Sequence, residues 1–565
     1  MDRSLRRKHE RLTKRSDYYI LSSTMILTPQ QLWKDYNRKE IPLGATTVNS
    51  GESTDCFFRT VYFNGEKVSD GITRIFAKLY VPKYALGKSA VIVFDDADRS
   101  VDAFDPAFYL KNGLSVLVVD YAGFADFKAR FTIYPKSLAT ANLFSEEKIL
   151  EDFETPAKES CWYVWTTVAL RAVTFLETED YQDLFFLGIG QGGEQVWKVC
   201  YFENTIRAGA IVFSGGAVKP IGVTDLSEEK NRGYLAYKAA LDSSAYANFI
   251  KSPVFMQITS NEQNASLDRM NELYETAGEH GAYLSISERA DRSIDPDRAD
   301  NISRWFSAVL RGEKLPESPI VSAKGSQNKL YYEIKAFDPA HITGISFFVA
   351  HAQKNSAFRN WRIESMQMIS EEEYLAKVEV LSATDPVFAF VNVQYDNGFC
   401  LSSAVEHIIP SSKNVLPETL TFKRLIYDSG MGLSDWLILN SSGGSNHKLS
   451  LQKGPFELEG ITSPSHSLTT FRLADPQYKG RADSTLQLTL FSPTAQTVSF
   501  IVTASDRLSK YTYIKELAIN KAWVKLTLSP GDFKGTRGSM INWQEVLTLE
   551  IKSAETVLVN SLLWV

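Results

Sequence analysis

Cysteine and histidine are scarce in this chain, and acidic residues outnumber basic ones. The cysteine count and the charge balance each disfavour a class of function. The four cysteines among 565 residues include no Cys-x-x-Cys pair, so neither a disulfide framework nor a zinc site is predicted. We interpret them as reduced packing residues. A net charge of −6 disfavours nucleic acid as a partner, because phosphate binding needs a basic face.

The chain also lacks an apolar run long enough to span a bilayer and a convincing secretory signal. Residues 1–15 are rich in Arg and Lys, while residues 18–24 are too short and polar for a signal core. We expect a disordered basic tail over residues 1–27 on a cytoplasmic protein with no membrane partner. A nucleic-acid or membrane arm is the alternative. Order is predicted to begin with Thr28, which precedes a proline as a helix cap does.

A serine is missing from the motif around which the chain is organised. An apolar run at residues 184–189 meets a glycine cluster and continues as a helix. Gly188 and Gly192 stand at the flanking positions of a nucleophile elbow, Gly-x-Ser-x-Gly, and Gly190 stands where the serine would be. Glycine has no side chain to acylate, which excludes covalent catalysis here. We expect a restored serine to be tolerated sterically, since the flanking glycines supply the turn.

The same cluster also contains the dinucleotide spacing Gly-x-Gly-x-x-Gly, which is a weak signal alone. A dinucleotide site needs an acidic residue at the tip of the next strand. The next strand, residues 208–213, is followed by Ser214 and two glycines and offers no acid. We therefore predict no cofactor and interpret the glycines as a tight turn packed against its helix.

Residues 56–319 alternate strand-like and helix-like segments, which predicts a mostly parallel sheet covered on both faces. An antiparallel hairpin is expected at the start, with its turn at Asn64 and Gly65. A helical insertion is expected over residues 217–250. The predicted buried strands and amphipathic helices are residues 90–94, 114–119, 160–178, 254–258, 267–277, 283–286 and 299–310.

With the elbow, the insertion and a closing helix around Trp305, this order resembles the α/β-hydrolase fold. The resemblance is closest to the acetyl-xylan-esterase and dienelactone-hydrolase-like branch, and it covers about residues 55–315. It implies a triad acid after strand 254–258 and a triad histidine in the loop before the closing helix. The acid position falls on Glu262. The histidine position falls within residues 289–294, where Arg292 stands and no histidine exists.

The resemblance therefore implies a degenerate triad of Gly190, Glu262 and Arg292. Arginine stays protonated at physiological pH and cannot act as the general base. His280 precedes the last strand of this region, and we interpret it as a surface residue.

The loop that should donate to the oxyanion contains Asp95 and Asp96, whose charge would disfavour a forming anion. We interpret these acids as solvated loop residues near the start of a helix. A calcium loop at residues 96–102 would lack its glycine and distal glutamate, so no metal is predicted.

Beyond Pro319 short alternating segments predict two all-β sandwiches. Residues 316–415 resemble the immunoglobulin-like domain appended to some family esterases. Residues 416–565 resemble the galactose-binding-like jelly roll of many carbohydrate-binding modules. Trp523 and Trp543 in the second sandwich are candidates for stacking on sugar rings, although aromatic residues in a sandwich usually belong to its core.

We therefore predict a multidomain protein, an α/β-hydrolase domain over residues 28–315 followed by two β-sandwiches. The expected function is that of a catalytically inactive esterase-like scaffold that binds a ligand, with a carbohydrate as the expected class. Two alternatives stay open: a hydrolase with a displaced nucleophile such as Ser214 or with paired carboxylates, and a protein-interaction scaffold. The expected ligand contacts are Asp95, Asp96, Gln191, Glu194, Glu262, Arg292, Trp523 and Trp543.

Overall fold

The structure is a computed structural model, and the described residues are 26–84, 87–123, 131–142, 157–216, 228–292, 296–326, 329–417, 422–439, 449–505, 508–519, 521–536 and 538–565. Most of the predicted basic tail and the start of the predicted insertion lie outside these residues. The chain divides into two compact units. The N-terminal unit comprises Met1–Met256, Glu272–Tyr283 and Ile302–Leu315, and the β-rich unit comprises Gln257–Asn271, Leu284–Asn301 and Pro316–Val565.

A nine-stranded sheet has the order β1-β2-β3-β5-β4-β6-β7-β8-β9. Its centre is parallel, because β4 pairs with both β5 and β6, and β6 pairs with β7, in parallel register. All side chains of β4, β5 and β8 are buried, as their continuous apolar runs require. The mostly parallel sheet predicted for the N-terminal half is confirmed. The strands are β4 (Ser89–Phe94), β5 (Ser115–Asp120), β6 (Asp183–Ile189), β7 (Ile206–Val212), β8 (Val254–Thr259) and β9 (Ala282–Ser287).

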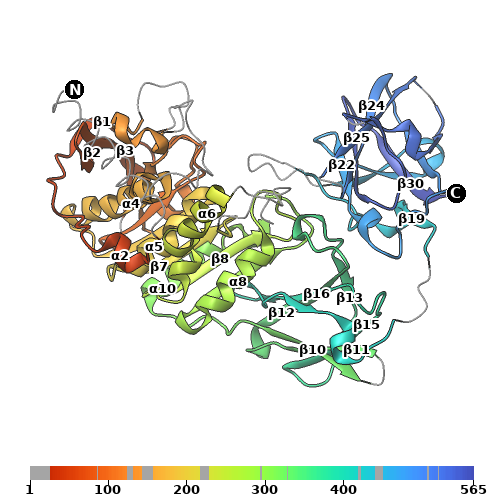
Figure 1. The fold of residues 1–565 in the computed structure, drawn as a ribbon, viewed down its shortest axis with the longest axis horizontal. Helices are drawn as coiled ribbons and strands as arrows, with labels where there is room; N and C mark the ends of the chain where they lie inside the picture. The colour runs from red at the N-terminus through yellow and green to blue at the C-terminus, as the bar shows by residue number, and fades with distance from the viewer. Residues whose placement is uncertain are drawn as a thin grey trace, which may run out of the picture. The chain divides into compact units, whose positions relative to one another are not determined.

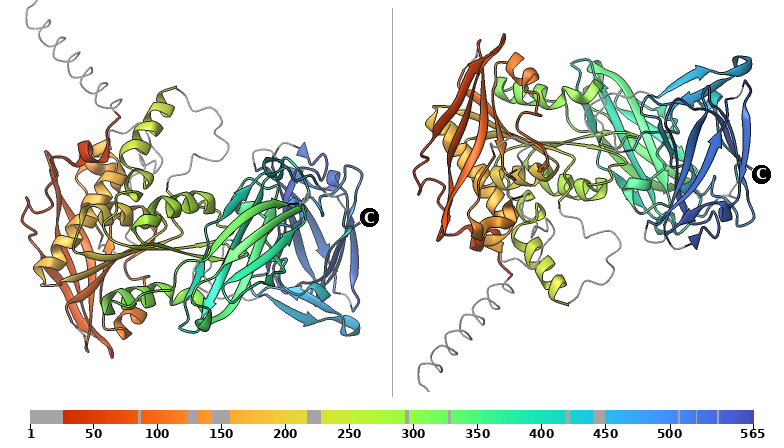
Figure 2. Two further views of the ribbon diagram at one scale, coloured as in Figure 1. Left: turned by 90° about the horizontal axis from the view of Figure 1, so that it is seen from below. Right: turned by 90° about the horizontal axis from the view of Figure 1, so that it is seen from above.

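Three antiparallel strands form one edge of this sheet: β1 (Thr46–Glu52), β2 (Cys56–Val68) and β3 (Gly71–Pro82). Figure 2 shows them as long neighbouring arrows in red and orange. The predicted hairpin is present, but its turn was placed wrongly. Strand β2 continues past Asn64 through an irregularity to Val68. Gly65 lies inside the strand, where an added Cβ would come within 3.0 Å of Ile75 Cδ1. This glycine therefore serves close packing, and the turn follows Val68.

The helices begin and end close to the predicted positions (Figure 1). Helix α4 starts after Ser160, whose hydroxyl accepts a hydrogen bond from Tyr163 N, and α2 has Thr28 as its cap. The bounds are α2 (Pro29–Trp33), α3 (Ala107–Lys111), α4 (Cys161–Thr178), α5 (Gly193–Phe202), α6 (Glu228–Ala240), α7 (Ser244–Ala247), α8 (Leu267–Ala277), α9 (Pro296–Ala299) and α10 (Asn301–Arg311).

The C-terminal half is rich in antiparallel sheets, coloured green to blue in Figure 2. One pair of sheets has the orders β10-β11-β15-β14 and β13-β12-β16-β17, with β18 paired to β16. Their inward side chains form one hydrophobic core. The strands are β10 (Ile320–Ser326), β11 (Lys329–Lys335), β12 (Ile342–His351), β13 (Arg362–Glu364), β14 (Gln367–Met368), β15 (Glu373–Val378), β16 (Val387–Tyr395), β17 (Cys400–Ser402) and β18 (Glu406–Ile408).

A second pair of sheets has the orders β20-β21-β30-β23-β26, with β19 paired to β30, and β22-β29-β24-β25-β27-β28. These sheets enclose a separate core. A small apolar cluster that includes Phe358 and Phe471 joins the two β regions. The strands are β19 (Leu425–Asp428), β20 (Ser450–Lys453), β21 (Glu459–Thr462), β22 (Ser467–Thr470), β23 (Leu486–Phe491), β24 (Gln496–Ala504), β25 (Lys510–Leu517), β26 (Val524–Leu528), β27 (Lys534–Gly535), β28 (Gly538–Ser539), β29 (Val546–Ser553) and β30 (Leu558–Trp564).

The structure also bears on the cysteines and on membrane-spanning helices. All four cysteines are buried and none of them forms a disulfide, as predicted for packing residues. None of the helices in the described part of the chain is both long enough and apolar enough to cross a membrane.

Candidate functional site

The glycine cluster forms a sharp turn between β6 and α5. Strand β6 ends at Ile189, a single 3-10 turn covers Gly190–Gly192, and α5 begins at Gly193. A Cβ on Gly188 would lie 2.4 Å from Gly192 O, and a Cβ on Gly192 would lie 2.1 Å from Phe94 O. Backbone passes too closely here for any larger residue. The turn expected of a nucleophile elbow is therefore present, and its glycines are needed for its shape.

The carboxylate of Asp96 lies where the side chain of a nucleophile would begin. Gly190 has a φ of +54°, and an added Cβ would lie only 1.8 Å from Asp96 Oδ1 and 2.5 Å from Asp96 Cγ. The expectation that a serine would be tolerated at Gly190 is therefore wrong. A serine requires the Asp96 side chain to move, and it must also adopt a backbone conformation that favours glycine.

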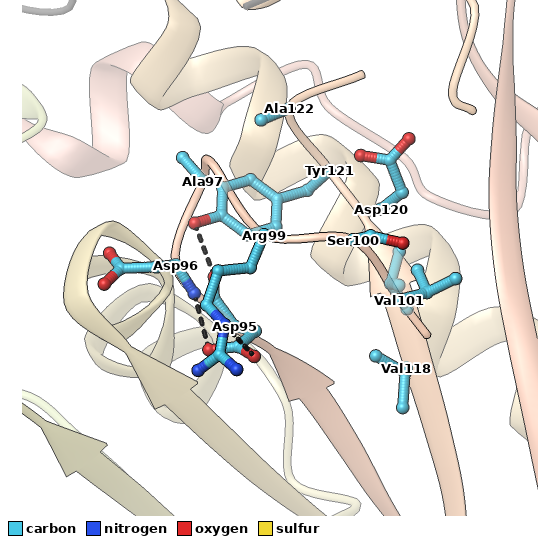
Figure 3. A pocket seen from close by; sticks show the side chains of 11 residues that line it. Asp95, Asp96, Ala97, Arg99, Ser100, Val101, Val118, Asp120, Tyr121 and Ala122 are labelled. Atoms are coloured by element: carbon cyan, nitrogen blue, oxygen red, sulfur yellow. Dashed lines mark hydrogen bonds and ion pairs between the residues drawn. The ribbon is translucent and has the colours of Figure 1, made fainter. Parts of the chain in front are cut away.

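Asp95 is the buried member of this acidic loop, which follows β4. Its Oδ1 accepts a hydrogen bond from Asp96 N at 2.8 Å, and its Oδ2 lies 3.5 Å from Arg99 Nε. Tyr121 donates its hydroxyl to Asp95 O at 2.8 Å, as Figure 3 shows. Burial raises the pKa of Asp95, and the Arg99 charge opposes that rise. The interpretation of Asp95 as a solvated residue is corrected, because the side chain is buried.

The crevice between this loop and the end of β5 does not provide a ligand pocket. Its lining includes Asp95, Asp96, Arg99 and Tyr121, and the space among them is too small to hold a water molecule. Burial and the surrounding aspartates raise the pKa of Tyr121 well above its ordinary value. The local field is therefore negative, which opposes an oxyanion beside the turn.

Gln191 is half-buried in the turn itself, whereas Glu194 is buried in the first turn of α5. Both carboxylate oxygens of Glu194 are engaged: Ser214 Oγ donates to Oε1 at 2.9 Å, and Ser243 Oγ donates to Oε2. The expectation that Glu194 contacts a ligand is corrected, because its oxygens already serve buried hydroxyl groups. The sequence offered no sign of this pairing, since the three residues lie far apart along the chain.

A buried lysine completes this polar cluster. Lys198 has no exposed surface, and its Nζ donates to Glu194 O at 3.1 Å. Burial lowers the pKa of Lys198, and the charges of Glu194 and Asp242 oppose that shift. Ser214, the candidate for a displaced nucleophile, is also buried. It donates to a carboxylate, which is the hydrogen bond that a base-activated hydroxyl would need.

In the β-rich unit the side chains of Glu262 and Arg292 are in contact. Arg292 Nη1 lies 3.4 Å from Glu262 Oε1, and the Glu262 side chain has 0% exposure. The same oxygen accepts a hydrogen bond from Asn264 N at 3.1 Å. This pair is an ion pair with no group that can take a proton from a hydroxyl near neutral pH. His280 is exposed, as predicted.

The loop that carries Glu262 is hydrogen-bonded to the segment between β12 and β13. The Asn261 side-chain amide donates to Arg359 O at 2.9 Å and to Ala357 O at 3.3 Å. Arg359 Nη1 and Nη2 lie 2.5 and 2.6 Å from the two carboxylate oxygens of Asp268. Trp361 Nε1 donates to Ser260 O at 3.4 Å. These bonds hold the loop as part of the β-rich unit.

The loop that carries Arg292 is hydrogen-bonded to the segment that follows β19. Arg289 Nη1 donates to Ser434 O at 2.6 Å, and Arg289 N donates to Ser260 Oγ at 2.8 Å. Arg289 and Arg292 both have a φ of +48°. Left-handed backbone at two non-glycine residues is maintained only where surrounding contacts determine it. These contacts include the bonds to Ser260 and Ser434.

The two tryptophan candidates differ in burial. Trp543 has 1% exposure, packs against Trp564 and Phe533, and donates its indole N–H to Ser484 O. Its expected role in sugar stacking is corrected, because a buried ring has no face free for a ligand. Trp523 is half-buried and donates to Pro455 O at 2.9 Å.

Sequence reasoning missed Phe456, which lies next to Pro455 in the turn between β20 and β21. Its side chain has 81% exposure, and its φ is +60°. A large apolar residue in left-handed backbone is uncommon, and such strain gathers at functional sites. The motif around it, Gly454-Pro455-Phe456, carries the turn signal of glycine and proline, and this was the available clue.

No group of three or more His, Cys, Asp or Glu side chains in the described ranges is arranged to hold a metal ion. No protein-family model matches the sequence, and no curated protein matches it.

Several solved structures are similar to about half of the chain. An acetyl xylan esterase from Paenibacillus sp. R4 has 13% identity and a TM-score of 0.35, over 48% of this chain and 90% of that one. Acetyl xylan esterase 1 from Thermoanaerobacterium sp. JW/SL YS485 has 14% identity and a TM-score of 0.34, over 52% and 98%. A cold-adapted esterase from an Arctic intertidal metagenomic library has 11% identity and a TM-score of 0.32, over 47% and 99%. These values are too low to carry an argument about function, which rests on the side chains.

Proposed function

We propose that this chain is an esterase-like scaffold that does not act as a serine hydrolase. The observation that carries the proposal is the position of the Asp96 carboxylate against Gly190. A serine-hydrolase mechanism needs a hydroxyl at that point, with donors directed at the developing oxyanion. Here a fixed negative charge takes the place of the nucleophile, and a second one, on Asp95, lies beside it.

The absence of a base supports the same conclusion. A hydrolase triad needs an imidazole that accepts and returns a proton, held by an acid. Glu262 instead pairs with the guanidinium of Arg292, which remains charged. The loops that carry these two residues are hydrogen-bonded to other parts of the β-rich unit through the side chains of Asn261 and Arg289. We therefore infer that the loops serve to assemble that unit.

The rival function is hydrolysis by Ser214 with Glu194 as base, and the 2.9 Å hydrogen bond between them favours it. Against it, Ser214 has 4% exposure, so a substrate carbonyl has no approach to its oxygen. Glu194 also accepts a hydrogen bond from Ser243, so both of its carboxylate oxygens are already engaged.

Hydrolysis of p-nitrophenyl acetate and of acetylated xylan tests the proposal. We expect the full chain to release product no faster than buffer, and no faster than the Ser214→Ala variant. Ser484→Ala is a matched control, because Ser484 is also a buried serine. Turnover above buffer that Ser214→Ala abolishes and Ser484→Ala retains would reject the proposal and support the rival.

We propose that any carbohydrate binds at Trp523 and Phe456 rather than at the glycine turn. Phe456 is exposed, and the half-buried Trp523 is hydrogen-bonded to the same turn through Pro455 O. Aromatic faces of this kind stack on sugar rings. Calorimetric titration with xylo-oligosaccharides tests this. We expect Phe456→Ala to weaken binding. The control is Phe358→Ala, a change in the buried apolar cluster, which should lower stability without weakening the binding of the folded protein.

A further inference from the structure

A second candidate site lies in the N-terminal unit, away from the glycine turn in sequence and lined by different elements. It is a cleft of about 710 Å³. Its lining comes from residues 35–41 after α2, residues 66–69 at the end of β2, Ser137, Lys158 and Tyr163. Small-molecule sites in proteins enclose roughly 300 to 1,000 Å³, so this cleft has the size of a ligand site.

Hydrogen bonds hold the walls of the cleft in place. Ser137 donates its N–H and its hydroxyl to the two carboxylate oxygens of Asp70, at 3.0 and 2.5 Å. Thr140 Oγ1 donates to Glu159 O at 2.7 Å. These bonds connect the β2–β3 hairpin to the segment at residues 136–141, and that segment to Glu159. The cleft therefore exists before any ligand binds.

The wall formed by residues 35–41 is anchored to helix α4. Arg171 Nη1 donates to Arg38 O at 2.5 Å. The Arg38 guanidinium forms ion pairs with Glu177 at 2.6 Å and with Glu203 at 2.8 Å. Trp33 stacks on Tyr163 with 4.3 Å between ring centres. Several partly buried contacts therefore hold this wall in place. A wall that keeps its shape loses less conformational entropy when a ligand binds.

The charges in the cleft favour a cation. The side chains along the described lining include four carboxylates and two lysines, namely Asp35, Glu40, Glu66, Glu159, Lys67 and Lys158. Burial raises the pKa of Glu66, the Glu40 charge raises it further, and Lys158 and Arg171 oppose the rise. Two carboxylates that disfavour each other's charge are stabilised when a cation comes between them.

The remaining lining favours an organic cation over a metal ion. Tyr36 and Tyr163 contribute aromatic rings, and Ile41 and Leu138 contribute apolar surface. The burial of both tyrosine hydroxyls and the Glu66 charge raise their pKa values. No cluster of ligands suited to a metal occurs in the described ranges. Aromatic rings beside carboxylates are the usual environment for an ammonium group on a carbon chain.

We propose that this cleft binds a small organic cation, with its ammonium group paired to Glu66 and Glu40 and its carbon chain against Tyr36 and Leu138. The site is separate from the glycine turn, so it needs neither a nucleophile nor a base. It gives the scaffold a ligand whose chemistry is amine recognition, independent of the carbohydrate proposal.

Calorimetric titration of the full chain with spermidine tests the proposal. We expect saturable binding, weakened about ten-fold in Glu66→Gln by the loss of one charge-assisted contact. Glu40→Gln is expected to weaken binding less, because Glu40 is exposed, and it keeps the test valid if Glu66→Gln does not fold. Glu373→Gln removes an exposed carboxylate from β15 and is the matched control.

The neutral diol 1,8-octanediol separates recognition of charge from recognition of shape. We expect it not to bind at concentrations where spermidine saturates the cleft. Three outcomes would overturn the proposal: no saturable binding of spermidine up to about 10 mM, equal weakening in Glu373→Gln, or equal binding of the diol.

Discussion

The glycine turn of the N-terminal unit and the two loops of the β-rich unit both lack the groups of a serine triad, but in different ways. At the turn the backbone has the shape that a nucleophile needs, and only the side chains differ: glycine at position 190 and the carboxylate of Asp96 against it. In the loops Glu262 and Arg292 lie together, and the neighbouring residues Asn261 and Arg289 are hydrogen-bonded to the segments before β13 and after β19. The first difference is local, whereas the second extends through the packing of a whole unit.

The comparison teaches that these two regions should respond differently to substitution. A change at Gly190 disturbs one backbone position and one half-buried side chain. A change in the loops breaks contacts on which the β-rich unit depends, because Asn261 and Asp268 are bonded to Arg359 just before β13, and Arg289 is bonded to Ser434 after β19. Stability should therefore depend more on the loops than on Gly190.

The largest effect is expected for Asp268→Ala. This change leaves the Arg359 guanidinium, which has 0% exposure, without its carboxylate partner. Because Asp268 is 42% exposed, the expected cost lies between those of a buried and an exposed pair, at about 2.5 kcal/mol of unfolding free energy. Urea unfolding followed by tryptophan fluorescence measures the loss.

The matched control for that prediction is Glu457→Ala, which removes the exposed ion pair with Lys453. An exposed pair contributes at most about 0.5 kcal/mol. Equal losses in Asp268→Ala and Glu457→Ala would show that the loop is not anchored by its pair with Arg359.

A cost of about 2 kcal/mol is expected for Gly190→Ala, because its Cβ meets the Asp96 carboxylate and its φ is positive. Adding Asp96→Ala should restore part of that stability by removing the clash. A double-mutant cycle on thermal unfolding measures the coupling. Additive effects of the two changes would mean that Asp96 does not occupy the nucleophile position.

A pH effect of similar size is expected from His351 in the β-rich unit. Burial, together with the Arg362 charge, lowers the pKa of His351 to about 4, while in the unfolded chain it is about 6.5. As pH falls below 6.5 the unfolded chain binds the proton first, so stability present at pH 7 is lost toward pH 4. We expect a loss of about 2 kcal/mol between pH 7 and 5.

The variant His351→Gln should remove that part of the pH dependence. His341→Gln is the control, because His341 is exposed and pairs with Asp396 at the surface. Asp95 acts in the opposite direction: its raised pKa contributes stability at low pH that is lost as pH rises. If His351→Gln left the pH dependence of stability unchanged, His351 would not be the cause of the stability lost at acidic pH.

The smallest effect is expected for Glu262→Gln, at about 1 kcal/mol, because Glu262 forms a long contact to Arg292 and one bond to Asn264 N. Thermal unfolding measures it. If Glu262→Gln lowered the unfolding free energy more than Asp268→Ala does, the predicted order of the two contacts would be wrong.

Much of the fold could be predicted because local sequence determines it. Continuous apolar runs identified strands β4 and β5, and helical spacing together with Ser160 identified α4. The turn at Gly188 was predicted because glycine is needed wherever backbone passes this closely. Strand β1 was missed because all seven of its residues are exposed, which leaves no alternating pattern to detect.

The site could be predicted only in part, since tertiary contacts decide what each side chain does. The sequence placed Glu262 near Arg292 but did not indicate that Asp96 reaches Gly190 across 94 positions. Trp543 was a candidate for a ligand contact because the sequence does not show whether an aromatic ring in a sandwich faces the core or the solvent; it lies in a bend before β29 with its ring in the core. The cleft at Glu66 was missed because its lining comes from five separate segments.

The most direct test of the central claim is intact-mass analysis of the full chain after treatment with a fluorophosphonate, which labels an activated serine. We predict no adduct at pH 7 to 8, because Gly190 offers no oxygen and Ser214 is buried. The variant Gly190→Ser with Asp96→Ala should also remain unlabelled, since a single restored triad member contributes little without its partners. A stoichiometric adduct on the natural chain, mapped to Ser214 and abolished by Ser214→Ala, would contradict the claim that this scaffold is not a serine hydrolase.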